Sequence, residues 1–150
     1  MTAITRRISE FAAGISFDAV PTEVIERTGM LLMDSIGIAL RAHHDAESTP
    51  GLVRAAMRLG LDGGTCVAIG DRRGFTPQGA ALINGTLIHS LDFDDTHARS
   101  SLHPSAPIVP AALAAAEMAG VDGEKLVPAI IAGYEIQTRL SMALGPSDHY

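Results

Sequence analysis

The sequence predicts an all-α fold, a multi-helix bundle of about six helices with at most one short strand or hairpin. Apolar residues recur at spacings of three and four in several segments, which is typical of helices packed on one side. A single run, Thr65 to Ile69, has the composition of a strand. The 150 residues are 47% hydrophobic and 19% charged, without a repeat or a linker, so one domain with its own core is expected.

Two helices are predicted in the first part of the chain. The first carries a short apolar stripe and frays at Gly14; the stripe consists of Ile4, Ile8, Phe11, Ala12 and Ile15. The second runs from Pro21 to Leu40, and Pro21 suits its first turn, where a missing N–H costs nothing. Its predicted buried stripe consists of Val24, Ile25, Thr28, Leu31, Leu32, Ser35, Ile36 and Ala39.

The middle of the chain predicts a loop, a helix, a hairpin arm and another helix. The polar residues 43–49 are expected to form a loop that exposes His43 and His44, and residues 50–59 a short helix that Gly60 stops. The strand-like run is bounded by glycines on both sides, which indicates a small hairpin. Thr76 and Pro77 are an N-cap and first-turn pair, and they open a helix of apolar residues that extends to Leu91.

Two helices are predicted for the last part. Ser105 is expected to cap an Ala-rich helix that tolerates Pro107 and Pro110 and ends at Gly120. Asp122 then caps a helix that ends at Gly145-Pro146. Cys66 is interpreted as a small buried residue, and five methionines are interpreted as core filler: Met30, Met33, Met57, Met118 and Met142.

Charge and composition narrow the function classes. The net charge of -6 and the scattered distribution of 11 basic residues argue against a nucleic-acid binder. The apolar stretches are far shorter than the ~20 residues of a bilayer span, so no membrane segment is expected. Cys66 has no partner for an internal disulfide, and the first residues lack an apolar signal core, which indicates a cytoplasmic protein.

The densest cluster of reactive side chains extends from His89 to His97 and is followed by His103-Pro104-Ser105. If the preceding helix persists through Thr96, then His89, Asp92 and Thr96 share one face, and Asp94 and Asp95 point elsewhere. Pro104 restricts the backbone beside it, so the imidazole of His103 is expected to be held opposite Asp92. An imidazole, a carboxylate and a hydroxyl in one place suit proton transfer.

Other interpretations of the cluster stay open. Asp94 and Asp95 also fit a solvated helix end, and His89 fits a hydrogen-bonded core residue. His149 is expected to be an exposed loop residue. An iron site from His97, Asp95 and His103 is conceivable, but no sequence signature supports it, and the spacings miss the common magnesium and zinc motifs. No metal is therefore expected, and the chain has no phosphate loop, dinucleotide motif or nucleophile elbow.

Residues 84–97 and 103–107, which contain Asp92-Phe93-Asp94-Asp95-Thr96 and His103-Pro104-Ser105, resemble the hallmark segment of the MmgE/PrpD family. That family includes 2-methylcitrate dehydratase, cis-aconitate decarboxylase and iminodisuccinate epimerase. Four further elements are similar to family positions: residues 34–37, residues 70–71, residues 132–135 and Arg139. The resemblance implies that residues 1–150 are the N-terminal portion of a helical domain, without the rest of that domain and a smaller α/β lid. It also implies a homodimer that needs no cofactor and acts on small di- and tricarboxylates.

The resemblance also assigns site residues. It implies that Asp92, Thr96 and His103 are catalytic and line the substrate pocket. We expect four further residues to contact the substrate: His89, Asp95, Arg99 and Ser105. Because the carboxylates would repel a polycarboxylate, Arg99 or cations outside this chain must offset them. The loop between His97 and Leu102 differs in length among relatives, so the distance from Asp92 to His103 is not carried over.

The leading function hypothesis is a cofactor-independent lyase, specifically a dehydratase of a small di- or tricarboxylate similar to 2-methylcitrate. His103 is expected to move the proton while Asp92 and Thr96 orient the substrate. Decarboxylation or epimerisation by the same family is the first alternative. A non-catalytic helical interaction or dimerisation fragment is the second, and a metal-dependent hydrolase is the third. The sequence leaves the identity of the acid open.

Overall fold

The computed structural model describes residues 3–144, and within them the chain is helical apart from one hairpin and its loops. The six α-helices and the short 3-10 helix η1 are α1 (Ala3–Gly14), η1 (Phe17–Ala19), α2 (Thr22–Asp45), α3 (Thr49–Arg58), α4 (Pro77–His89), α5 (Ser105–Ala119) and α6 (Gly123–Leu144). The hairpin consists of β1 (Asp62–Val67) and β2 (Gly74–Phe75). The predicted all-α class with a single small hairpin is therefore confirmed.

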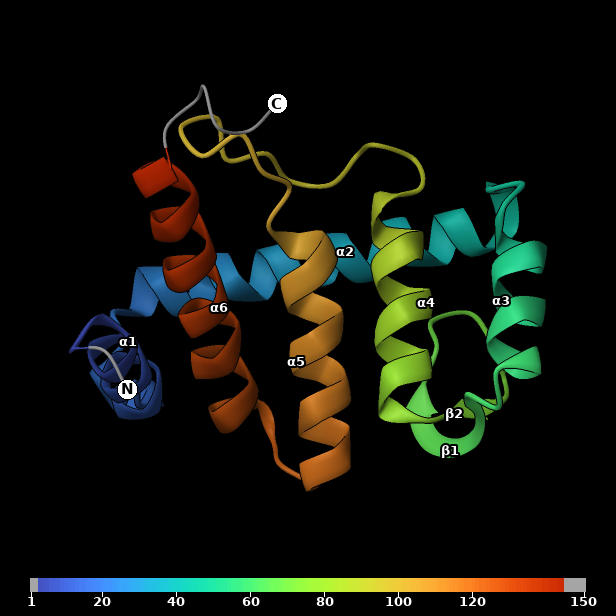
Figure 1. The fold of residues 1–150 in the computed structure, drawn as a ribbon, viewed down its shortest axis with the longest axis horizontal. Coiled ribbons are helices and arrows are strands. Elements are labelled where there is room, and N and C mark those ends of the chain that lie inside the picture. The colour runs from blue at the N-terminus through green and yellow to red at the C-terminus, as the bar shows by residue number, and fades with distance from the viewer. Residues whose placement is uncertain (1–2, 145–150) are drawn as a thin grey trace.

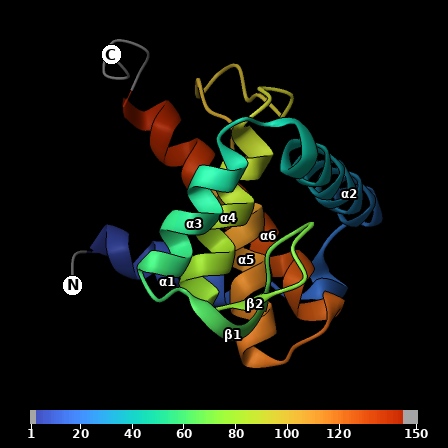
Figure 2. The same ribbon diagram turned by 90° about the vertical axis from the view of Figure 1, so that its right-hand side faces the viewer.

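The helices form two layers. Figure 1 shows α4, α5 and α6 side by side, with α2 crossing behind them. The turned view in Figure 2 shows α3 and the hairpin beside α4, and α1 contacts α6 instead. Helix α4 therefore lies at the centre of the molecule, between α2, α3, α5 and the hairpin.

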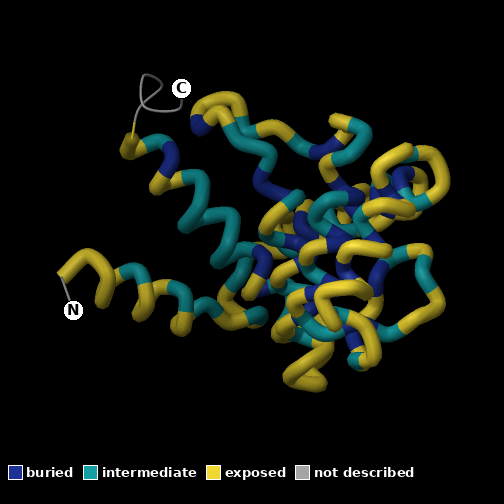
Figure 3. Tube along the Cα trace, turned by 45° about the vertical axis from the view of Figure 1, so that its right-hand side comes forward, coloured by how far each residue is buried: buried dark blue, intermediate teal, exposed yellow. Residues whose placement is uncertain are grey.

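The core follows from that central position. Ile83, Leu87 and Ile88 of α4 are completely buried, and they cluster with Ala39 of α2 and Val109 of α5. Burying one such aliphatic side chain contributes about 1.5–3 kcal/mol relative to its exposure. Figure 3 shows the buried segments concentrated in this part of the molecule, whereas α1 contains no buried residue. The core thus supports the end of α4, where the reactive cluster begins.

Helix α2 is longer than the sequence predicted. It continues to Asp45, so His43 and His44 lie in its last turn and the predicted loop at these residues is wrong. His44 is exposed as expected, but His43 is half-buried because its ring packs on Gly70, where an added Cβ would lie 2.5 Å from His43 Cγ. Ala42 is completely buried in the core cluster, so tertiary packing explains how the helix continues through a polar run.

Asn84 of α4 fastens the hairpin to the core. Its Oδ1 accepts a hydrogen bond of 2.7 Å from the backbone N–H of Ile69, and its Nδ2 donates one of 2.9 Å to the carbonyl of Val67. The paired strand covers Asp62–Val67, earlier than predicted, and a bulge interrupts its register between Asp62 and Cys66. Ile69 therefore satisfies its backbone through α4 rather than through a strand partner.

The predicted helix boundaries have mixed outcomes. The Thr76 hydroxyl caps α4 by accepting from the Gly79 N–H at 3.1 Å, as predicted, and Gly120 ends α5 with a φ of 64°. The predicted Ser105 cap of α5 is wrong, since Pro104 is the N-cap residue and the Ser105 hydroxyl contacts Tyr134. Asp122 accepts from the Glu124 N–H before α6, and the predicted end at Gly145-Pro146 lies outside the described residues, as does His149.

Several side chains predicted to be buried are exposed. Met30, Met33, Met57 and Met118 are 38–70% exposed and Met142 is half-buried, so their interpretation as core filler is wrong. On α2, Thr28, Ser35 and Ala39 are buried as predicted, but Val24 and Ile36 are exposed. Other elements cover only one side of α2, and the apolar residues of α2 extend beyond that side. Cys66, 1% exposed, is buried as predicted.

None of the helices within residues 3–144 has the length and apolar character that a membrane span requires.

Candidate active site

The reactive cluster includes the last residue of α4, the first residue of α5 and the loop that joins them, and this loop runs across one end of both helices (Figure 1). Helix α4 ends at His89, and the Asp92 backbone has a φ of 55°. This left-handed conformation is incompatible with a continuing α-helix, and Asp is one of the few residues that adopts it at modest cost. The expectation that His89, Asp92 and Thr96 share one helical face is therefore wrong.

A compact turn brings the loop back over the end of α4. The N–H of His97 donates to the carbonyl of Leu102 at 2.9 Å, and His97 Nδ1 lies 2.7 Å from the Ser100 hydroxyl. Ser141 of α6 donates a hydrogen bond of 2.6 Å to the carbonyl of Ser100, which is buried. These contacts hold the turn against α6, and they place His103 opposite the end of α4.

Asp94 lies at the centre of the resulting cluster. Its side chain is fully buried, and His89 Nδ1 lies 3.1 and 3.0 Å from its two oxygens. His103 Nδ1 lies 3.4 Å from Asp94 Oδ1, and the two imidazole rings meet edge to face with centroids 4.9 Å apart. Four side chains each place one ring nitrogen or carboxylate oxygen within 4.8 Å of the others: His89, Asp92, Asp94 and His103. Two imidazoles and two carboxylates therefore share one small volume.

The structure thus brings together only part of the predicted trio. Asp92 and His103 are neighbours, as expected, although the loop achieves this rather than a helical face. Thr96 and Arg99 are exposed residues of the same loop, and their predicted roles stay predictions. Sequence reasoning directed Asp94 away from the site because it assumed a continuous helix. The left-handed residue that redirects the chain has no signature beyond the tolerance of Asp for that conformation.

Asp95 and Ser105 belong to a second network beside the cluster. Asp95 Oδ1 accepts from the Ser105 N–H at 3.0 Å, and Oδ2 accepts from the Tyr134 hydroxyl at 2.8 Å. The hydroxyls of Ser105 and Tyr134 are also in contact. A carboxylate at the N-terminus of α5 is favourable because of the helix dipole. The network ties the loop to α5 and α6, a structural role that sequence reasoning did not find.

Tyr134 is held protonated in this network. Burial raises the pKa of its hydroxyl well above the usual value, and the hydrogen bond to the Asp95 carboxylate raises the pKa further. The hydroxyl therefore acts as a hydrogen-bond donor to Asp95. Both predicted substrate contacts, Asp95 and Ser105, are already engaged with protein groups, and their predicted role in substrate binding stays a prediction.

The cluster also has the donor types that divalent transition metals prefer, imidazole nitrogens and carboxylate oxygens. Within residues 3–144 the close set comprises His89, Asp92, Asp94 and His103. It differs from the conceivable set of His97, Asp95 and His103, because His97 pairs with Ser100 and Asp95 with Tyr134. A metal bound through His89 Nδ1 would have to replace the hydrogen bond to Asp94.

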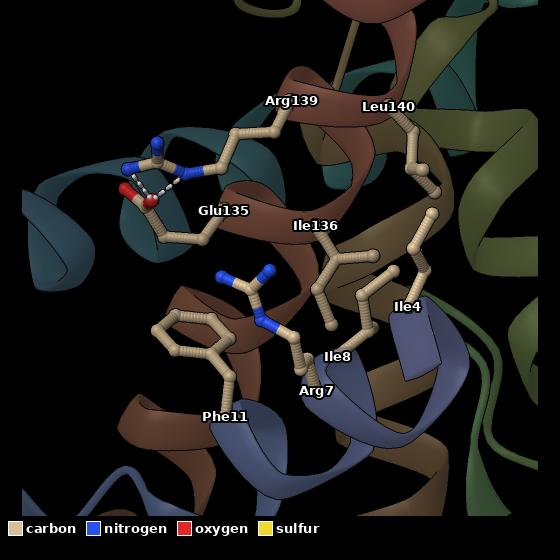
Figure 4. A pocket seen from close by; sticks show the side chains of 8 residues that line it. All are labelled: Ile4, Arg7, Ile8, Phe11, Glu135, Ile136, Arg139 and Leu140. Atoms are coloured by element: carbon tan, nitrogen blue, oxygen red, sulfur yellow. Dashed lines mark hydrogen bonds and ion pairs between the residues drawn. The ribbon is translucent and has the colours of Figure 1, made fainter. Parts of the chain in front are cut away.

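One groove lies beside the cluster, and another lies between α1 and α6. His89 lines a groove of about 520 Å³ between α4 and α5, together with Gly85 and Ala106. Figure 4 shows another groove, of about 390 Å³, where apolar side chains of α1 face Ile136 and Leu140 of α6. Arg139, which the resemblance singled out, lines this second groove and donates to Glu135 at 2.6 Å. Arg139 is therefore not part of the cluster around Asp94.

Comparison with known families decides what kind of domain this is. The family model of the MmgE/PrpD N-terminal domain matches residues 6–150. The chain belongs to the MmgE/PrpD family. The resemblance of the Asp92–Thr96 and His103–Ser105 segments is thereby confirmed at the level of the family.

Curated relatives of this MmgE/PrpD chain match along nearly its whole length. A cis-aconitate decarboxylase-like protein of Aspergillus oryzae is 29% identical, with 97% of this chain and 31% of the relative covered. The cis-aconitate decarboxylase of Aspergillus terreus is also 29% identical, with 98% and 31% covered. The human cis-aconitate decarboxylase is 26% identical, with 93% and 30% covered. The chain therefore spans about a third of the length of these relatives.

Proposed function

We propose that this MmgE/PrpD domain supplies the acid–base part of the active site of a lyase that acts on a small di- or tricarboxylate. The observation that carries the proposal is the meeting of His103 with Asp92 and buried Asp94 at the end of α4. An imidazole is the side chain best suited to accept and then donate a proton in water at ordinary pH. Such a group can give or take a proton on carbon without a cofactor.

In the proposed reaction His103 moves the proton, while Asp92 and Thr96 orient the substrate. In a decarboxylation the bond between carbon and a carboxylate breaks, and CO₂ leaves. The electron pair of the broken bond forms a new double bond and displaces the electrons of the adjacent one. His103 then donates a proton to the carbon at the far end of the original double bond. In a dehydration His103 instead removes a proton from carbon, and the electron pair of that C–H bond forms the new double bond. The C–O bond on the neighbouring carbon breaks, and the hydroxyl leaves as water with a proton taken from solvent.

Decarboxylation is the first of these outcomes to test. The names of the three relatives described above are those of cis-aconitate decarboxylases or a protein like them, whereas the family resemblance had led to the expectation of a dehydratase of a 2-methylcitrate-like acid. The same proton-transfer groups serve both reactions, so the cluster supports the lyase class without choosing between them. The names of the relatives favour decarboxylation over dehydration. We therefore propose cis-aconitate as the first substrate and 2-methylcitrate as the second.

The charge of the site bears on substrate binding. Asp92 and Asp94 lie in the cluster and the whole chain carries a net charge of -6, which disfavours a polycarboxylate. Arg99 is exposed on the same loop. We propose that Arg99 offsets part of this repulsion, with other cations of the complete active site supplying the rest.

The test is an assay of the full-length protein with cis-aconitate, 2-methylcitrate and related acids, measuring CO₂ release and the organic product. His103→Ala and Asp92→Asn should each lower kcat/KM at least about tenfold, because each removes a group used in the transition state. Asp18→Asn, an exposed change in η1, is the matched control and should leave turnover unchanged. If both site variants stay within about threefold of wild type, which is under ~1 kcal/mol, the proposed roles are wrong.

A second candidate function is a non-catalytic interaction or dimerisation module. The exposed apolar side chains of α2, Met30, Met33, Ile36 and Leu40, favour a surface that packs against another protein segment. The assay separates the candidates, because a protein with this second function alone would turn over none of the acids. Metal analysis of protein purified without chelator tests the remaining metal-dependent hydrolase alternative.

A further inference from the structure

We infer that Asp94 is the positioning residue of this site, a buried carboxylate that turns Nδ1 of both His89 and His103 toward itself and leaves each Nε2 for proton transfer. The inference rests on the proposed function for its catalytic meaning. Its structural content, the orientation and tautomer of two imidazoles, stands independently. Neither the sequence pattern nor the family resemblance had singled out Asp94.

The burial of Asp94 requires partners of this kind. The residue is 6% exposed, and its side chain is fully buried. An ionised carboxylate in the protein interior is costly unless hydrogen-bond donors or positive charges compensate it. His89 Nδ1 lies within hydrogen-bond distance of both oxygens, and His103 Nδ1 approaches Oδ1 to 3.4 Å. Asp94 therefore contacts the two imidazoles on their Nδ1 sides.

The chemistry of the carboxylate sets the tautomer. An ionised Asp only accepts hydrogen bonds, so an imidazole that faces it through Nδ1 must carry its proton there. The opposite nitrogen, Nε2, then has a free lone pair when the ring is neutral and an N–H when the ring is charged. A histidine fixed in this way can act as a base and then as an acid through one atom, as in carboxylate–histidine pairs of hydrolases.

The two histidines differ in how closely they approach Asp94. Its Nδ1 is buried and has no hydrogen bond of good geometry among the described residues, and Asp94 Oδ1 is at 3.4 Å. Catalytic hydrogen bonds are often long before substrate binds and shorten in the complex. A small movement of the loop that carries His103 would complete this bond. The 53% exposed side chain of His89, by contrast, already has the full hydrogen bond and borders the groove between α4 and α5.

The first arm of the test measures the tautomers directly. Long-range proton–nitrogen NMR of the full-length protein without substrate, at a pH where the rings are neutral, identifies the protonated nitrogen of each histidine. His89→Gln and His103→Gln assign the signals. We expect Nδ1–H in both rings of the wild type and a shift toward Nε2–H in Asp94→Asn, because the new amide can donate to Nδ1. Nε2–H in both wild-type rings would overturn the inference, whatever the variants do.

The second arm measures turnover and its pH profile. Asp94→Asn should lower kcat at least about tenfold with a smaller change in KM, because the tautomer affects proton transfer more than substrate binding. Asp94→Glu keeps a carboxylate acceptor and should recover part of the rate. Asp18→Asn is the surface control, and the melting temperature of every variant reports folding. An Asp94→Asn enzyme that folds and keeps kcat and its pH profile within threefold would contradict the inference.

The two arms separate this inference from the proposed function. If none of the tested acids is turned over but both rings carry Nδ1–H, the proposed function fails and the orienting role of Asp94 stands. If cis-aconitate is turned over and the rings carry Nε2–H, the proposed function stands and the role of Asp94 is wrong.

Discussion

At the residue scale, three neighbouring aspartates have three different environments. Asp92 is exposed in a left-handed conformation, Asp94 is buried between two imidazoles, and Asp95 accepts from Ser105 and Tyr134. Asp92 therefore lies where the chain changes direction, whereas the carboxylate of Asp94 orients histidines and that of Asp95 anchors a helix. Which role each residue has depends on where the loop places it, and adjacent positions in the sequence are not interchangeable.

Asp71 and Arg73 provide a prediction about pH and stability at this scale. The Arg73 side chain hydrogen-bonds the Asp71 carboxylate and holds its pKa below the usual value, against the opposing effect of burial. A lowered pKa in the folded state stabilises the protein above the unfolded-state value of about 3.9. That contribution is lost as the pH falls through the folded-state pKa.

Asp71→Asn should therefore lower the free energy of unfolding near pH 7 by about 0.5–1 kcal/mol, a small value because the Arg73 side chain is 47% exposed and solvent screens it. Urea unfolding at several pH values measures this. The difference from wild type should shrink below about pH 4. A difference that grows with falling pH would contradict the sign of the effect.

At the element scale, α4 connects the core, the hairpin and the site. Its start follows from local chemistry, the Thr76 cap and Pro77. Its end at His89 does not follow from the helical pattern, which extends to Leu91, and depends on how the loop folds over α5 and α6. The helix thus presents His89 at its last position, where the side chain reaches Asp94. A longer helix would have carried Asp92 away from His103.

Asn84 is the element-scale position with the clearest expected cost. Asn84→Ala would leave the Ile69 N–H and the Val67 carbonyl without their side-chain partners. An unsatisfied buried group costs about 1–3 kcal/mol, and because both hydrogen bonds are only partly buried the free energy of unfolding should fall by about 1–2 kcal/mol. Gln78→Ala, an exposed change on the same helix, is the control and should stay within about 0.5 kcal/mol. Equal losses in the two variants would contradict the fastening role of Asn84.

At the scale of the whole molecule, one end of the helical layer carries the site and the outer surface of α2 carries exposed apolar residues. Met30 and Met33 of α2 and Phe93 of the loop are 56%, 70% and 75% exposed. They line a groove of about 730 Å³. An apolar surface of this kind is typical of a site that contacts another protein segment.

Dye binding tests this surface. The 150-residue chain should raise the fluorescence of an environment-sensitive hydrophobic dye, because exposed apolar side chains provide a binding surface. The double variant Met30→Gln, Met33→Gln should reduce that signal at least about twofold without lowering the melting temperature, since neither side chain is buried. Met142→Gln, at a half-buried position of α6, is the comparison variant for a Met-to-Gln change outside α2. A dye signal that is insensitive to the α2 changes would place the exposed apolar surface elsewhere.

The sequence by itself determined the all-α class, most helix starts and the family, because apolar periodicity, caps and short motifs are local properties of the chain. It also placed the reactive side chains in one short segment. Only the tertiary structure decided that Asp94 faces the two imidazoles, that Tyr134 holds Asp95, and that the α2 methionines are exposed. The surroundings of Asp94 and Asp95 depend on a left-handed turn at Asp92 and on contacts such as Ser141 with Ser100, which join residues far apart in the chain. The exposure of the methionines depends on which side of α2 the other elements cover. Such contacts exist only once the helices have packed, so no local pattern encodes them.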